Sequence, residues 1–131
     1  MDNEEKAFEF FKEGEYEQAV IVLDTLIGTK SNDANLADMY CNRGYCQWRL
    51  KNFNEAAQDL LECISRNPDN YLAYIWLYLI FSDIGKPETA MEYWKRGKLA
   101  GGENFHELYM AIIDNNEDTN FLIDETELVK I

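Results

Sequence analysis

The side chains of this sequence that could perform chemistry are few and widely spaced. His106 is the only imidazole in 131 residues. No glycine-rich elbow or phosphate-binding loop surrounds any Ser, Thr or Cys. The chain has 25 acids, but paired carboxylates on helices usually form solvated faces rather than acid–base pairs. We therefore predict no catalytic residues and no enzymatic activity.

The three cysteines, Cys41, Cys46 and Cys63, are too scattered to form a zinc site with a single histidine. Their odd number also leaves at least one thiol unpaired. Because Cys packs like a small apolar residue, we expect buried free thiols, with no metal and no cofactor. The N-terminus, Met1 to Glu5, is acidic where a secretory signal would be basic, so the sequence predicts a cytoplasmic protein.

The acidic segment from Asp114 to Glu125 has the spacing of a calcium-binding loop. Oxygen-bearing side chains occupy its first, third and fifth positions, and Glu125 is its twelfth residue. The segment thus resembles an EF-hand loop, although Thr119 stands where the sharp turn requires glycine. We predict that residues 114–131 form a solvated acidic tail, with calcium binding as the alternative.

The net charge of −13 limits the classes of partner. Nucleic acids and anionic membrane surfaces carry negative charge and would repel the chain, so we expect neither as a partner. No run of about 18 apolar residues is present, so we also expect no membrane span. A basic or cationic protein would instead be attracted.

Apolar residues recur at helical spacing along the whole chain, which predicts an all-α fold. The expected helices span residues 4–13, 16–28, about 34–50, from the cap Asn52 to before Asn67, 71–84, from Pro87 to near residue 100, and 104–113. Asn52 and Glu55 have the spacing of a capping box at the start of the fourth helix. The fifth helix is apolar on every side, so it is either buried all round or exposes one face for binding.

Three short segments share one sequence pattern: a turn, then an aromatic residue or Pro, then a helix that opens on an acid and a small Ala. The segments end at Ala19, Ala56 and Ala90, which lie 37 and 34 residues apart. This is the spacing of a helical-hairpin repeat. Such arrays usually bind other proteins on a concave surface rather than catalyse a reaction.

The middle repeat has the clearest signature, in Tyr40, Gly44, Phe53, Ala56, Leu60 and Pro68. With these residues the chain resembles the tetratricopeptide repeat family. Gly44 and Ala56 stand where the two helices of a hairpin touch, whereas Tyr78 replaces a small residue in the third repeat. The resemblance implies about three repeats (residues 3–33, 37–70 and 71–104) in a right-handed superhelix, then a capping helix (104–113), so that residues 1–113 form the repeat domain and 114–131 the tail.

In this family the first helix of each repeat lines the concave groove. By position, the resemblance assigns the following partner-binding residues: Phe8, Phe11 and Lys12; Asn42, Tyr45, Trp48 and Arg49; Leu72, Ile75, Trp76 and Leu79. This is an aromatic surface with a small basic patch at Lys12 and Arg49. Trp48 and Trp76 either face a partner or pack between repeats or under the C-terminal tail.

Family members that hold the acidic C-termini of heat-shock chaperones use a clamp of Lys, Asn and Arg side chains. At the five clamp positions this chain has Glu4, Phe8, Asn42, Leu72 and Trp76. Only Asn42 matches, and Glu4 would repel a carboxylate. The resemblance therefore does not extend to that function.

Three hypotheses follow for the function. The first is a non-catalytic interaction module that holds an apolar or basic segment of a partner protein in the groove. The second is a small chaperone, or an immunity or inhibitor protein, dedicated to one client. The third is self-recognition, in which tail residues Phe121 to Ile123 dock into the groove of the same chain or of a second copy.

Overall fold

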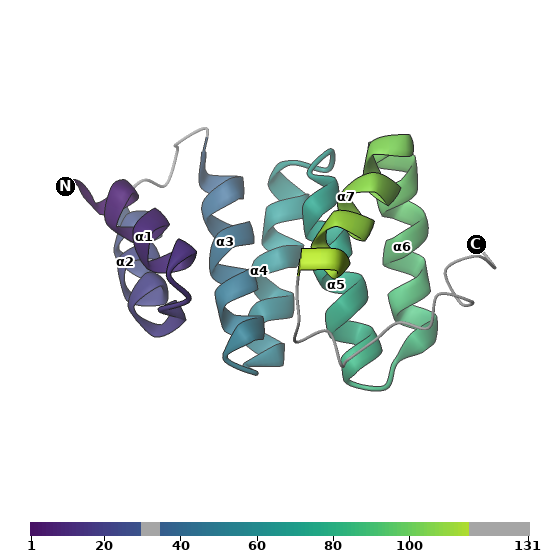
Figure 1. The fold of residues 1–131 in the computed structure, drawn as a ribbon, viewed down its shortest axis with the longest axis horizontal. Helices are drawn as coiled ribbons and strands as arrows, with labels where there is room; N and C mark the ends of the chain where they lie inside the picture. The colour runs from purple at the N-terminus through teal and green to yellow at the C-terminus, as the bar shows by residue number, and fades with distance from the viewer. Residues whose placement is uncertain (30–34, 116–131) are drawn as a thin grey trace. The chain divides into compact units, whose positions relative to one another are not determined.

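The computed structural model describes residues 1–29 and 35–115 of the chain, and within them every regular element is an α-helix (Figure 1). In chain order the helices are α1 (Asn3–Lys12), α2 (Tyr16–Thr29), α3 (Leu36–Arg49), α4 (Phe53–Arg66), α5 (Tyr71–Asp83), α6 (Pro87–Gly101) and α7 (Glu103–Asn115). The predicted all-α fold is confirmed, and each helix begins and ends within a few residues of its predicted bounds.

The chain divides into two compact units, Met1–Asn67 and Pro68–Ile131, which we call unit 1 and unit 2. In unit 1 each helix packs on the next, from α1 to α4. In unit 2, α5 packs on α6, and α7 lies against both. Within each unit, neighbouring helices in sequence are therefore neighbours in space, as in an array of helical hairpins. The boundary at Asn67 lies three residues before the predicted end of the second repeat at residue 70.

The three hairpins close with the same type of turn. Gly14, Lys51 and Gly85 follow α1, α3 and α5, and their φ angles are 75°, 66° and 79°. Glycine adopts positive φ readily, whereas a residue with a Cβ is disfavoured there by about 1–2 kcal/mol. The recurring sequence pattern thus corresponds to a recurring backbone conformation.

One predicted cap is wrong. The side chain of Asn52 makes no hydrogen bond to the backbone of α4. Its Nδ2 instead donates to Gln47 Oε1 at 2.8 Å, because the turn brings that side chain within reach. By contrast, Asp2 caps α1 by accepting a hydrogen bond from the Glu5 amide at 2.8 Å.

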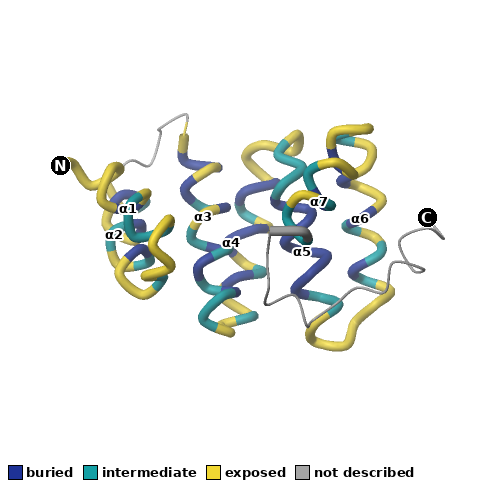
Figure 2. Tube along the Cα trace, viewed as in Figure 1, coloured by how far each residue is buried: buried dark blue, intermediate teal, exposed yellow. Residues whose placement is uncertain are grey.

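Helix α5 is buried on all sides over residues 73–80, which Figure 2 shows as an unbroken dark segment. Of the two alternatives for this apolar helix, burial all round is therefore correct over these residues. Tyr78, the departure from the family pattern, is 5.1 Å from the ring of Trp94 and 6.4 Å from that of Tyr109. Phe105 and Tyr109 of α7 are fully buried. Helix α7 thus covers the hairpin of α5 and α6 with its apolar side, as a capping helix does.

Helices α3 and α4 approach each other closely at Gly44. A Cβ added to Gly44 would lie 2.8 Å from Leu60 Cγ and 3.2 Å from the carbonyl oxygen of Ala56. No side chain fits there unless the helices separate. The predicted contact between these two small residues is confirmed.

We predict that Gly44→Ala destabilises the protein by about 1–3 kcal/mol, because the clash with α4 outweighs the gain in helix propensity of about 1 kcal/mol. Gly28→Ala is the matched control, since a Cβ at this α2 position meets nothing within 4 Å. That variant should be up to about 1 kcal/mol more stable than wild type. Urea unfolding measures both, and a Gly44→Ala protein as stable as Gly28→Ala would contradict the close contact.

Arg43 of α3 joins α2, α3 and α4. Its Nε and Nη2 donate to the two carboxylate oxygens of Asp59 at 2.9 and 2.7 Å, and its Nη1 donates to Asp24 at 2.9 Å. Burial raises the pKa of Asp59, although the guanidinium of Arg43 acts in the opposite direction. The bidentate pair therefore offsets a desolvation cost, and its main effect is to fix α3 against its neighbours.

We predict that Asp59→Ala lowers the free energy of unfolding by about 2–4 kcal/mol, because it leaves a half-buried guanidinium without its bidentate partner. Asp24→Ala should cost less than about 1 kcal/mol, because the Asp24 side chain is 57% exposed and that of Asp59 only 9%. Equal losses in the two variants, measured by chemical denaturation, would show that burial does not set the strength of this network.

Candidate functional site

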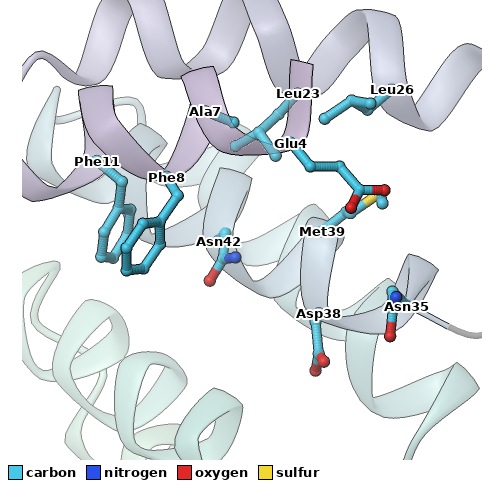
Figure 3. Close-up of a pocket in the computed structure, with 10 residues that line it drawn as sticks. All are labelled: Glu4, Ala7, Phe8, Phe11, Leu23, Leu26, Asn35, Asp38, Met39 and Asn42. Carbon is cyan, nitrogen blue, oxygen red and sulfur yellow. The ribbon is translucent and has the colours of Figure 1, made fainter. Parts of the chain in front are cut away.

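A hollow of about 290 Å³ lies among α1, α2 and α3 of unit 1 (Figure 3). The residues that line it are Glu4, Ala7, Phe8, Phe11, Leu23, Leu26, Asn35, Asp38, Met39 and Asn42. Its volume is at the lower end for small-molecule pockets. It is therefore better suited to one or two inserted side chains than to a cofactor.

The floor of the hollow is apolar and its edge is exposed. Ala7, Leu23 and Met39 are buried in the floor, whereas Phe8 is 60% exposed. Figure 3 shows Phe8 and Phe11 side by side at one end, with Asn42 next to Phe8 on the side toward Met39. The amide of Asn42 can both donate and accept a hydrogen bond, so it can pair with a backbone peptide group.

Charged side chains mark both ends of this region. Glu4 and Asp38 lie in the first turns of α1 and α3, and Lys12 and Arg49 lie in the last turns. The Lys12 ammonium is 5.1 Å from the centre of the Phe8 ring. We use the name α1/α3 face for Glu4, Phe8, Phe11, Lys12, Asp38, Asn42, Tyr45 and Arg49.

An aromatic cluster joins α1, α2 and α3 at the basic end of the α1/α3 face. The ring of Tyr45 is 5.0 Å from that of Phe11, 5.8 Å from that of Tyr16 and 5.8 Å from that of Trp48. Arg49 lies 5.7 Å from the Tyr16 ring. Burial, and then a hydrogen bond with Tyr16, raises the pKa of Tyr45 above its usual range. The cluster thus stays neutral and holds the three helices together.

Residues 37–70, which cover α4 and nearly all of α3, match the family model of the tetratricopeptide repeat. The predicted resemblance is confirmed over the middle repeat. Tetratricopeptide repeats are generally protein–protein interaction modules without catalytic activity. A comparison with curated proteins gave no match.

The structure places the predicted groove residues at very different depths. Phe8, Lys12 and Asn42 are exposed, Phe11, Tyr45, Arg49 and Leu72 are partly buried, and Trp48, Ile75, Trp76 and Leu79 are buried. Six of the eleven predicted groove residues belong to the α1/α3 face of unit 1, and the α3 part of this face lies within the tetratricopeptide match. The four residues from α5 belong to unit 2. Trp48 and Trp76 are only 3% and 7% exposed. Binding of a partner through the predicted groove residues stays a prediction. In this conformation little of either indole is exposed to a partner.

Glu4, Asp38 and Met39 line the hollow but were not among the predicted binding residues. The repeat register does not pair the two acids, because the equivalent turns at Gly14 and Lys51 are 37 residues apart, whereas Glu4 and Asp38 are 34 apart. The signal that could have identified the acidic end is the preference of acids for the first turn of a helix, where both residues stand.

No group of three or more His, Cys, Asp or Glu side chains that could hold a metal occurs within residues 1–29 and 35–115. The predicted calcium loop from Asp114 to Glu125 extends beyond the described residues, and the tail segment from Phe121 to Ile123 lies wholly outside them. Both stay predictions. None of the helices in the described ranges has the length and apolar character needed to cross a membrane.

All three cysteines are buried free thiols, as predicted. A hydrogen bond with Cys63, together with burial, raises the pKa of Cys41 well above its usual value. Burial raises the pKa of Cys46 to about 12. Because the thiolate is the reactive form, these side chains are poor nucleophiles in the folded protein.

We expect a thiol reagent such as dithionitrobenzoate to label none of the three cysteines rapidly at pH 8 in the native state, since burial keeps the reagent from all three and raised pKa values keep the thiols of Cys41 and Cys46 protonated. In denaturant all three should react at once. A cysteine that reacts within seconds under native conditions would contradict its burial, and mass spectrometry of the labelled peptides would identify it.

Proposed function

We propose that the α1/α3 face binds a segment of another protein and that the chain performs no catalysis. The observation that carries this proposal is the exposure of Phe8 at the edge of an apolar hollow. Exposed aromatic residues beside apolar hollows are common at protein-binding sites and often supply much of the binding energy. The tetratricopeptide match over α3 and α4 supports the same class of function.

The contacts suit an apolar or basic segment of the partner. An apolar side chain of the partner would enter the hollow and cover Phe8, and full burial of such a side chain contributes about 1.5–3 kcal/mol. Asn42 would hold the peptide backbone, and the net charge of −13 would attract basic residues from a distance. We place this interaction in the cytoplasm, where three free thiols remain reduced.

The same face could serve a general adaptor or a small chaperone or immunity protein with one client. These two roles differ in the number and stoichiometry of partners. One protein that co-purifies at a one-to-one ratio would favour a dedicated chaperone or inhibitor. Several weak partners that compete for the face would favour an adaptor.

The test compares affinity purifications with wild type, Phe8→Glu and Ile21→Glu as baits. Ile21 is a suitable control because it is an exposed apolar residue of α2, 66% exposed, that does not line the hollow. Both substitutions are on the surface and should change stability by less than about 0.5 kcal/mol. A charged side chain in place of Trp48 or Trp76 would instead be buried. Such a variant would report on folding rather than on partner binding.

We expect Phe8→Glu to weaken partner binding by at least about tenfold, which corresponds to about 1.4 kcal/mol, while Ile21→Glu binds as wild type does. Titration of each variant with the recovered partner gives the dissociation constants. A partner that both variants retain equally would show that the α1/α3 face is not the binding site.

A further inference from the structure

We propose that the α1/α3 face selects a segment with an ordered charge pattern: a basic residue, an apolar anchor and an acidic residue, with the basic residue held beside Glu4 and Asp38. This inference rests on the proposed function and narrows the partner from an apolar or basic segment to one that carries both signs of charge. The occupant is an extended stretch of another protein chain.

The first support is the arrangement of charge along the face. Glu4 and Asp38 both line the hollow, and none of the lining residues within the described ranges 1–29 and 35–115 is basic. Figure 3 shows Glu4, Asn35 and Asp38 at the end opposite to Phe8 and Phe11. Lys12 follows Phe11 directly, and Arg49 lies over the Tyr16 ring, which is 6.5 Å from that of Phe11. The acids and the bases therefore occupy opposite ends.

The second support is the physical origin of this order. Acids in the first turn and bases in the last turn of a helix interact favourably with its dipole. Helices α1 and α3 both follow this rule. Because they lie side by side with Phe11 paired to Tyr45, and with Glu4 and Asp38 at the same end, they run in the same direction. The dipole-matched charges of the two helices therefore form one strip, with acidic side chains at one end and basic side chains at the other.

The dimensions of the strip set the spacing in the ligand. Lys12 is eight residues beyond Glu4 and Arg49 is eleven beyond Asp38, which is about 12–16 Å at about 1.5 Å per helical residue. An extended segment advances about 3.3 Å per residue. Its basic and acidic residues should therefore be about four to five positions apart, with the apolar anchor between them.

The ion pair of Lys12 with Glu9 does not block this role. The Lys12 ammonium is 3.6 Å from Glu9, but both side chains are about half exposed. Exposed pairs of this kind are weak and exchange readily with other partners. A ligand carboxylate that is held in place by the buried anchor can therefore compete for Lys12.

The test selects binders from a phage-displayed library of random peptides of about twelve residues, which is about 40 Å when extended. Wild-type protein is the target, and binders that Phe8→Glu also retains are removed. We expect the surviving sequences to share Lys or Arg and Asp or Glu about four to five positions apart, on opposite sides of an apolar residue.

The best peptide is then titrated against Glu4→Lys and Lys12→Glu, each of which should weaken binding by about three- to tenfold. Glu5→Lys and Lys98→Glu are matched controls, because they make the same charge changes in a first and a last turn but do not belong to the α1/α3 face. A peptide in which the basic residue is replaced by an acid should recover affinity for Glu4→Lys. A nitroxide label at the basic end of the peptide should broaden the amide resonances of Asp38 more than those of Arg49.

Three results would overturn the inference in distinguishable ways. If no peptide separates wild type from Phe8→Glu, the proposed function of this face fails and the charge pattern fails with it. If peptides are selected without an ordered pair of charges, or if the controls weaken binding as much as Glu4→Lys, only the charge pattern fails. Broadening at Arg49 rather than Asp38 would reverse the proposed orientation.

Discussion

The contact between α3 and α4 at Gly44 determines which side chains of α3 face outward in unit 1. Because a Cβ there would overlap with Leu60, the two helices are packed too closely at this point for any residue but glycine. Asn42 precedes Gly44 by two residues, which is about 200° around the helix axis. The contact that buries Gly44 therefore turns Asn42 outward. Arg43, between them, reaches both α2 and α4, so the rotation of α3 is fixed from two sides.

Most of the fold could be predicted because its signals are local. Helical spacing of apolar residues, the turns at Gly14 and Gly85, and the pairing of Gly44 with Ala56 all depend on nearby residues or on one hairpin. The cap predicted at Asn52 failed because its side chain binds elsewhere: Nδ2 donates to Gln47 Oε1 of the preceding helix. Local patterns identify a candidate cap but do not identify competitors.

The depth of the site residues was harder to predict, for a related reason. Periodicity shows which residues share one side of a helix, but it does not show what covers that side. Phe8 and Trp48 were both assigned to the groove by position, yet one is exposed and the other buried. Helix α5 was equally ambiguous, because it is apolar all round and its burial depends on neighbours distant in sequence. The acidic end of the face, in contrast, was indicated by the sequence, since Glu4 and Asp38 stand in the first turns of α1 and α3, where acids are favoured.

The burial of all three indoles has a spectroscopic consequence. Trp48 belongs to unit 1, whereas Trp76 and Trp94 belong to unit 2, and each is at most 7% exposed. Each unit thus contains its own intrinsic fluorophore in an apolar environment, and its emission shifts to longer wavelength when that unit opens to water. Replacing Trp76 and Trp94 with Phe leaves emission from unit 1 alone. The cooperativity between the two units can therefore be followed optically without an attached dye.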